Sequence, residues 1–146
     1  MYQRILIPVD GSPTSERAID EAVQFAHQQG AQVEVIMIVE DLLYFEDDNG
    51  VNYAALLDIV KSNNEKILAT AEQKFQQAGI AVVSKLLEAK GERIANKIVA
   101  EAKSFQADLI IIGTHGRSGF SRMVLGSVAE AVLRMAHIPI LLIRGG

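Results

Sequence analysis

Five short aliphatic runs, separated by longer stretches of helical periodicity, constrain the fold of this 146-residue chain more than any other feature. The runs are centred near residues 7, 36, 83, 110 and 141, so successive centres lie 29, 47, 27 and 31 residues apart. Each interval has room for a helical crossover and is far too long for a hairpin, so the sequence predicts strands that are mostly parallel. The predicted strands are residues 5–9, 33–39, 80–87, 109–113 and 138–143.

The stretches between the runs carry apolar residues at helical spacing. Ser12 is predicted to cap the first helix, with Pro13 at its first position. The second stretch, 53–78, is periodic and is followed by Gly79, a typical helix end, but the sequence leaves open whether residues 62–64 interrupt it. Two further stripes consist of Ile94, Ile98, Ala102 and Phe105, and of Val128, Ala131, Val132 and Met135.

Composition completes the prediction of the fold class. Hydrophobic residues make up 49% of the chain and aromatic residues 5%, so we expect an aliphatic core, as in a sheet that is buried on both faces. We predict one domain over residues 1–146, an open, doubly wound, five-stranded parallel α/β sheet with helices on both faces. The acidic, turn-rich segment 40–52 is predicted to be a surface loop in preference to a lid over a site.

Charge and cysteine content limit the classes of function. The net charge of −4 is scattered, with no basic block, which argues against a nucleic-acid partner. The chain has no cysteine, which excludes disulfides and thiolate metal sites. The apolar run near the N-terminus covers only five residues before Asp10, too few for a signal peptide or a membrane span. We therefore expect a cytoplasmic protein without membrane insertion.

Two polar strand exits indicate a ligand crevice, because open parallel sheets bind ligands beyond the carboxyl ends of their strands. The first strand ends in "PVDGS" (8–12) and the fourth in "GTHG" (113–116). Main-chain N–H groups at Gly113, Gly116 and Gly126 could approach an anion, and Ser127 and Glu130 have the spacing of a capping box at the start of the last helix. A phosphate chain is the simplest ligand for this arrangement. The alternative is that the glycines only turn the chain and cap a helix.

The same residues resemble the signature of a known family. The phosphate loop of P-loop enzymes is absent, since residues 104–146 contain no lysine, and Asp10-Gly11-Ser12 stands where a dinucleotide fingerprint would begin. "GTHGRSGFSRMVLGS" fits the pattern G-x2-G-x9-G-S/T, and in this the chain resembles the nucleotide-binding subgroup of the universal stress protein family. The opening "ILIPVDGS" and the closing "AHIPILLIR" are similar to that family's first and last strands. The resemblance therefore runs the full length of the chain.

The resemblance implies a strand order of 3-2-1-4-5, a site for ATP with Mg²⁺ as a candidate companion ion, and a homodimer formed through the strand 138–143. It also implies that Asp10 accepts hydrogen bonds from ribose hydroxyls, and we add Arg117 as a candidate phosphate contact. The nucleotide-binding residues expected on this basis are Pro8, Val9, Asp10, Val39, Gly113, His115, Gly116, Arg117, Gly126, Ser127 and Val128.

Three functions stay open. We predict an ATP-binding regulatory or stress-response protein rather than a dedicated enzyme, because phosphoryl transfer needs a fixed metal, a neutralising cation and a group that orients the nucleophile. Asp10 is the only obvious metal candidate, and the three histidines at 27, 115 and 137 do not have metal-ligand spacing. Slow ATP hydrolysis or autophosphorylation is the alternative. A flavodoxin-like electron carrier is the third, and the absence of Trp disfavours it.

Overall fold

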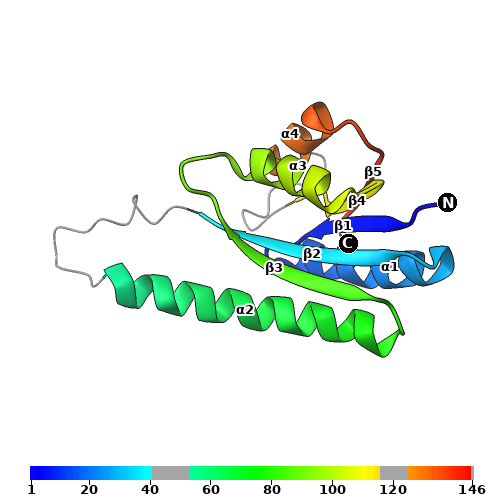
Figure 1. Cartoon of the computed structure of the whole chain (residues 1–146). Helices are drawn as coiled ribbons and strands as arrows, with labels where there is room; N and C mark the ends of the chain where they lie inside the picture. Colours follow the sequence, from blue (N-terminus) through cyan, green and yellow to red (C-terminus); the bar gives the residue numbers. More distant parts are fainter. Residues whose placement is uncertain (41–52, 116–124, 146) are drawn as a thin grey trace.

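Strands and helices alternate along residues 1–40, 53–115 and 125–145, the part of the chain that the computed structural model describes (Figure 1). Within that part there are five strands and four helices, and each predicted strand is present with its ends within two residues of the prediction. In chain order the elements are β1 (Arg4–Pro8), α1 (Pro13–Gln29), β2 (Gln32–Val39), α2 (Tyr53–Gln77), β3 (Val82–Glu88), α3 (Ile94–Phe105), β4 (Leu109–Gly113), α4 (Ser127–Met135) and β5 (Ile140–Ile143).

The strands form one parallel sheet in the order β3-β2-β1-β4-β5, which confirms the predicted topology. The central strand is β1, where Ile5 pairs with Val33 of β2 on one side and with Leu109 of β4 on the other. Helices α1 and α2 cover one face of the sheet, and α3 and α4 cover the opposite face (Figure 1). The crossovers therefore diverge between β1 and β4, where doubly wound sheets form their ligand crevice.

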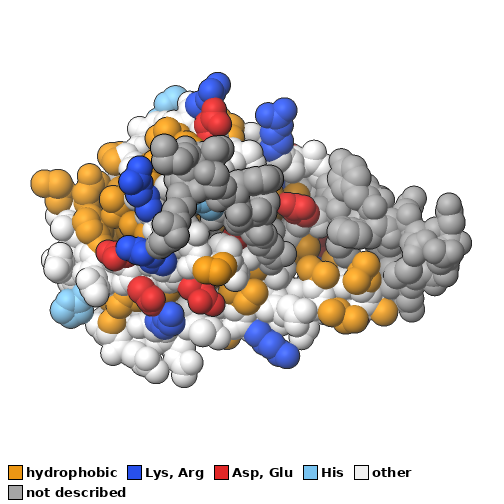
Figure 2. Space-filling view, turned by 180° about the vertical axis from the view of Figure 1, so that it is seen from behind, with side chains coloured by type: hydrophobic (Ala, Val, Ile, Leu, Met, Phe, Trp, Pro, Cys, Tyr) orange, Lys and Arg blue, Asp and Glu red, His pale blue; other side chains and the backbone are white. Residues whose placement is uncertain are grey.

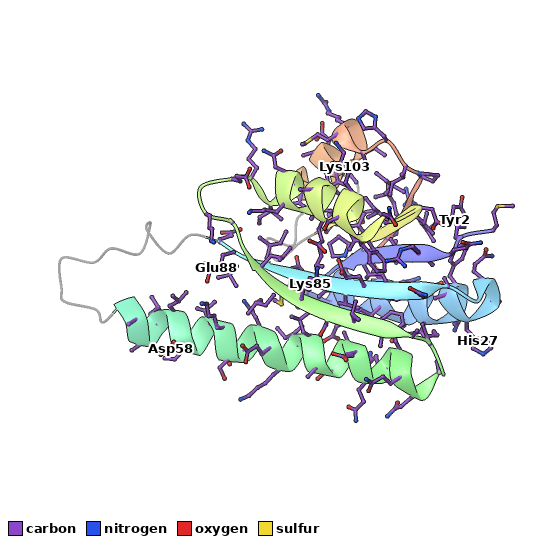
Figure 3. All side chains as sticks on the ribbon, viewed as in Figure 1. Tyr2, His27, Asp58, Lys85, Glu88 and Lys103 are labelled. Atoms are coloured by element: carbon purple, nitrogen blue, oxygen red, sulfur yellow. The ribbon has the colours of Figure 1, made fainter. Side chains whose placement is uncertain are left out.

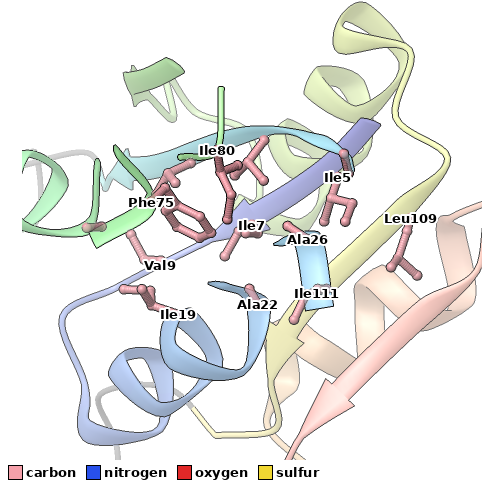
Figure 4. Close-up of a cluster of buried hydrophobic side chains, with 14 of the residues drawn as sticks. Ile5, Ile7, Val9, Ile19, Ala22, Ala26, Phe75, Ile80, Leu109 and Ile111 are labelled. Carbon is pink, nitrogen blue, oxygen red and sulfur yellow. The ribbon is translucent and has the colours of Figure 1, made fainter. Parts of the chain in front are cut away.

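The three central strands, β2, β1 and β4, are buried on both faces under mainly aliphatic side chains, as the composition predicted. On β1, Ile5 and Ile7 point to the α1 and α2 face, where they pack with residues such as Ala22 and Phe75 (Figure 4). Leu6 points to the other face and packs against α3 and α4. Because successive side chains of β1 point to opposite faces, they belong to two separate cores. Both cores are apolar, so the sequence of β1 is a continuous apolar run.

The cap of α1 and the continuity of α2 can be compared with the sequence predictions. Ser12 caps α1 as predicted, since its Oγ accepts a hydrogen bond of 3.1 Å from the main-chain N–H of Ser15, and Pro13 is the first helical residue. Helix α2 continues without a break through residues 62–64. Asn64 is buried there at 5% exposure, although asparagine is a poor helix former.

Strands β3 and β5 each begin two residues later than predicted, for physical reasons that lie in the preceding turn. The N–H of Ile80 donates to the carbonyl of Phe75, so Ile80 belongs to the turn that ends α2 rather than to the strand. Pro139 has no N–H to donate and precedes the first residue of β5. The predicted surface loop lies, except for Glu40, outside the described residues.

Charge is spread over the surface rather than gathered. On the face that Figure 2 shows, lysine and arginine side chains are dispersed, with acidic and uncharged side chains between them. Across the described ranges, no helix combines the length and the apolar content that a membrane span requires.

Candidate functional site

A cavity of about 510 Å³ opens at the carboxyl ends of β1, β2 and β4, where the sequence predicted a ligand crevice. This volume lies within the range of small-molecule sites. We call it the main cavity. Its described lining consists of Pro8, Val9, Asp10, Ser15, Ile36, Met37, Ile38, Val39, Glu40, Val60, Asn64, Ile94, Ile98, Ile112, Gly113, Thr114, His115, Gly126, Ser127, Val128 and Ala129.

The turn after β1 fixes Asp10 at the cavity wall. Its Oδ1 accepts a hydrogen bond of 2.9 Å from the N–H of Ser12, and its own N–H donates to the Oγ of Ser15 at 3.1 Å. Gly11 follows at φ +80°, a left-handed conformation that glycine adopts without strain. Asp10 thus takes part in the structure at the start of α1, a role that is compatible with binding a ligand.

Gly113, at the end of β4, is required by packing against α1. A Cβ on Gly113 would lie 2.8 Å from Cγ2 of Thr14 and 3.3 Å from the main-chain oxygen of the same residue. The absence of a side chain therefore lets β4 lie close to the first turn of α1. Beyond Gly113, the Oγ1 of Thr114 lies 3.0 Å from Nδ1 of His115, and both residues line the main cavity. This part of the glycine signature has a structural reason that applies with or without a ligand.

The start of α4 differs from the prediction, because Ser127 and Glu130 do not form a capping box. The N–H of Gly126 donates to the carbonyl of Thr114 at 2.6 Å, and this long-range contact makes Gly126 the N-cap. Ser127 consequently occupies the first helical position and makes no capping hydrogen bond, while Glu130 pairs with Arg134 at 2.7 Å.

The same contact corrects the prediction about main-chain amides. The amide of Gly126 is already used, so it is not available to an anion. The first hydrogen bond within α4 runs from Glu130 to the carbonyl of Gly126, which leaves the amides of Ser127, Val128 and Ala129 ahead of the helical ladder. These three residues line the main cavity. The positive end of the helix dipole therefore faces the cavity, shifted by one residue from the expected position.

The described lining is otherwise mostly apolar, and its charged side chains are acidic. It contains the carboxylates of Asp10 and Glu40 and no lysine or arginine. Among the described residues, no group of three or more histidine, aspartate or glutamate side chains is arranged to hold a metal ion. Aliphatic side chains of β2, α2 and α3 supply most of the remaining wall. The cavity thus offers an apolar slot at one end and unpaired amides at the other.

The structure brings together every predicted site residue that it describes. Pro8, Val9, Asp10, Val39, Gly113, His115, Gly126, Ser127 and Val128 all line the main cavity. Gly116 and Arg117 lie outside the described residues.

Sequence reasoning missed the contribution of α2, from which Val60 and Asn64 reach the cavity. These residues are four apart and continue to Leu68, so they read as an ordinary core stripe. Asn64, the single polar residue between Val60 and Leu68, is the sequence feature that could have indicated this part of the site.

Known proteins of similar sequence cover nearly the whole chain. The family model described as "Universal stress protein family" matches residues 1–144. A universal stress protein of Methanocaldococcus jannaschii is 31% identical over 144 residues, which are 99% of this chain and 83% of that protein. The universal stress protein YxiE of Bacillus subtilis is 30% identical over 151 aligned positions, covering 99% of this chain and all of that protein.

Solved structures of the same family have a similar fold. A protein of the universal stress protein family from Burkholderia pseudomallei superposes with a TM-score of 0.81 at 29% identity, over 98% of this chain and 96% of the other. Two more distant structures share the fold: a universal stress protein in complex with cAMP (TM-score 0.73, 23% identity, 99% and 98% covered) and one from Archaeoglobus fulgidus in complex with dAMP (TM-score 0.68, 24% identity, 98% and 98% covered). By sequence and by structure alike, the chain belongs to the universal stress protein family.

Proposed function

We propose that this protein binds an adenine nucleotide, ATP in particular, in the main cavity and acts as a regulatory or stress-response protein. The observation that carries the proposal is the joining, in one cavity, of an apolar slot with the three unpaired amides at the start of α4. A nucleotide has the matching division into a flat base and a charged phosphate chain. The cAMP and dAMP complexes of two proteins with the same fold support this choice of ligand class.

The base and the phosphates of the nucleotide are expected at opposite ends of the cavity. Val9 and Val39 border the slot at the ends of β1 and β2, where a base would be shielded from water. Asp10 is the acceptor for ribose hydroxyls. The amides of Ser127 and Val128 bind phosphate oxygens, because unpaired N–H groups and the helix dipole favour an anion there.

The charge of the described lining limits how many phosphate groups the cavity can bind without a further cation. Asp10 and Glu40 are acidic and the described lining has no basic side chain, so a triphosphate needs a further counter-charge. We assign that role to Arg117, with Gly116 beside the phosphates, or to a Mg²⁺ ion that accompanies the nucleotide. Of the described lining residues, Asp10 and Glu40 have the carboxylate oxygens that Mg²⁺ prefers.

Binding rather than turnover is the function that the described lining supports. It has no lysine or arginine of its own to neutralise a transferring phosphoryl group, so turnover would depend on Arg117 or on a bound Mg²⁺ ion. Nor does it have a Trp, Tyr or Phe ring to stack on a flavin, which leaves the electron-carrier alternative without support. Slow ATP hydrolysis stays an outcome of the test below.

The test is calorimetric titration of the wild-type protein and of Ser127→Asp with ATP and with adenosine. We expect the added carboxylate to weaken ATP binding by on the order of tenfold through repulsion of the phosphates, and to change adenosine binding less than twofold. Ser104→Asp, on the exposed side of α3, is the matched control and should leave both affinities unchanged. Absence of binding heat and of thermal stabilisation by ATP at millimolar concentration would remove the proposal. Steady release of ADP from wild-type protein would replace it with the ATPase alternative.

We also propose that two copies of the chain pair through β5. This strand lies at the edge of the sheet, and all four of its residues are only partly buried. An apolar edge strand has unpaired main-chain groups that a second copy can satisfy across a two-fold axis.

A further inference from the structure

Asn64 is the one buried polar side chain of the described residues that lacks a partner. The buried polar residues are Ser12, Ser15, Glu34, Asn64 and Thr114. Ser12 and Ser15 are joined in the turn after β1, Thr114 contacts His115, and Glu34 lies 3.7 Å from the ammonium of Lys85. The carboxamide of Asn64 forms no hydrogen bond with the described residues, although the residue is only 5% exposed.

The surroundings of Asn64 explain where its carboxamide points. It lines the main cavity, and it also lines a second cavity of about 420 Å³ together with Asp10, Gly11 and Val60. The side chain therefore lies where the two cavities meet, and its carboxamide nitrogen and oxygen are not among the buried side-chain atoms without a partner, as expected for a polar group that reaches a cavity. Its helical neighbours on the same stripe, Leu68 and Phe75, are buried in the core between α2 and the sheet.

An asparagine at this position is unfavourable for the helix by itself. Asparagine disfavours the helical backbone, and its carboxamide forms no hydrogen bond with the described residues that would compensate. Leucine at position 64 would continue the apolar stripe of α2. A residue that weakens the fold and faces a cavity is typical of a site whose partner is the ligand.

Position in the fold shows which part of a nucleotide Asn64 would meet. Helix α2 packs on the sheet face that it shares with α1, whereas α4 and its unpaired amides belong to the opposite face. Asn64 thus lies at the Asp10 and Val60 side of the cavity, away from the phosphate-binding end. An uncharged carboxamide offers one acceptor and two donors, which suit the edge of a base or a sugar hydroxyl.

We infer that Asn64 hydrogen-bonds the nucleoside half of the ligand and determines which nucleosides the main cavity accepts. This inference rests on the proposed function, since it names a contact of the same nucleotide. The contact comes from α2, outside the glycine signature that carries the phosphate-binding residues.

The experiment measures the affinity of wild-type protein, Asn64→Leu and Asn64→Ala for adenosine, AMP and ATP by calorimetry. Loss of one uncharged hydrogen bond is expected to weaken all three ligands by the same factor, about five- to tenfold. The ligand-free Asn64→Leu protein should melt no lower than wild type, because the change removes no hydrogen bond to the described residues and replaces asparagine by a better helix former of similar size. Asn64→Ala has no side chain that could clash, so it checks that the loss does not come from steric exclusion.

Asn96→Leu, at a partly buried position of α3 away from both cavities, is the matched control and should bind like wild type. Titration with 2′-deoxyadenosine and with inosine locates the contact. The factor lost in Asn64→Leu should shrink for the ligand that lacks the partner group, sugar or base.

The possible failures are distinguishable. Wild-type protein that binds no nucleotide removes the proposed function itself. Wild-type protein that binds, together with variants within twofold of it, overturns the role of Asn64 alone. A loss confined to ATP also overturns it, because the contact would then be with phosphate. So does a drop in melting temperature without a change in affinity, which would show a structural role.

Discussion

Replacing the buried Glu34 by glutamine should remove a large part of the pH dependence of stability near neutrality. Glu34 lies on β2 at 2% exposure, and its Oε1 has no hydrogen-bond partner. Lys85, which projects from β3 (Figure 3), lies 3.7 Å from Glu34 and 3.1 Å from Glu101 of α3. Burial, followed by the neighbouring Glu101 carboxyl, raises the pKa of Glu34 from 4.5 to about 7, although Lys85 acts in the opposite direction.

The sign follows from proton linkage. Because the folded protein holds the Glu34 proton more tightly than the unfolded chain, the stabilisation is complete below pH 4.5 and is lost as the pH rises to about 7. At about 1.4 kcal/mol per pH unit, the loss over this window is on the order of 3 kcal/mol. The pKa of Glu101 is lowered, since hydrogen bonds from Glu34 and Lys85 outweigh its burial, so its contribution is lost only in more acidic solution.

Urea unfolding at several pH values between 4.5 and 8 tests this reasoning. The free energy of unfolding of wild type, relative to Glu34→Gln, should fall by about 3 kcal/mol across the window and then level off. Glu65→Gln, an exposed position on α2, is the control and should follow the wild-type pH profile. If the difference between wild type and Glu34→Gln stays constant from pH 4.5 to 7, Glu34 titrates like an ordinary glutamate and the argument from burial is wrong.

Two more predictions concern packing and assembly. Gly113→Ala should lower the free energy of unfolding by about 1–3 kcal/mol in a denaturant titration, because the new Cβ would lie 2.8 Å from Cγ2 of Thr14. Thr14→Ser removes that methyl group and should restore part of the loss, whereas additive effects of the two changes would exclude the contact as the cause. Pairing through β5 predicts a dimer in sedimentation equilibrium that dissociates on dilution, and the mass of one chain at every concentration would rule it out.

The fold could be predicted from the sequence because its strongest signals are local. A strand buried on both faces appears as an aliphatic run, and intervals of 27 residues or more between run centres leave no hairpins, so strand identity and direction follow from residues close in sequence. The errors come from contacts between residues far apart. The start of α4 is set by the hydrogen bond from Gly126 to Thr114, and local capping preferences then gave the wrong N-cap. Whether residues 62–64 interrupt α2 was undecidable for the same reason, because Asn64 owes its place in the helix to what surrounds it.

The candidate site was predictable only where it lies on strand ends and turns. Glycines after β4 and an aspartate after β1 stand out against aliphatic strands, and the described ones do line one cavity. Side chains on a helix give no such signal, because residues four apart pack against a core and line a cavity with the same period. What separates the two cases is a polar group within the stripe together with its partner, and the partner is visible only in three dimensions. Glu34 and Asn64 are both polar residues in apolar elements, yet Lys85 lies beside the first and no described residue bonds the carboxamide of the second. Lys85 therefore gives the first an ionic partner within the protein, whereas the second lines a cavity, where a partner can come from outside.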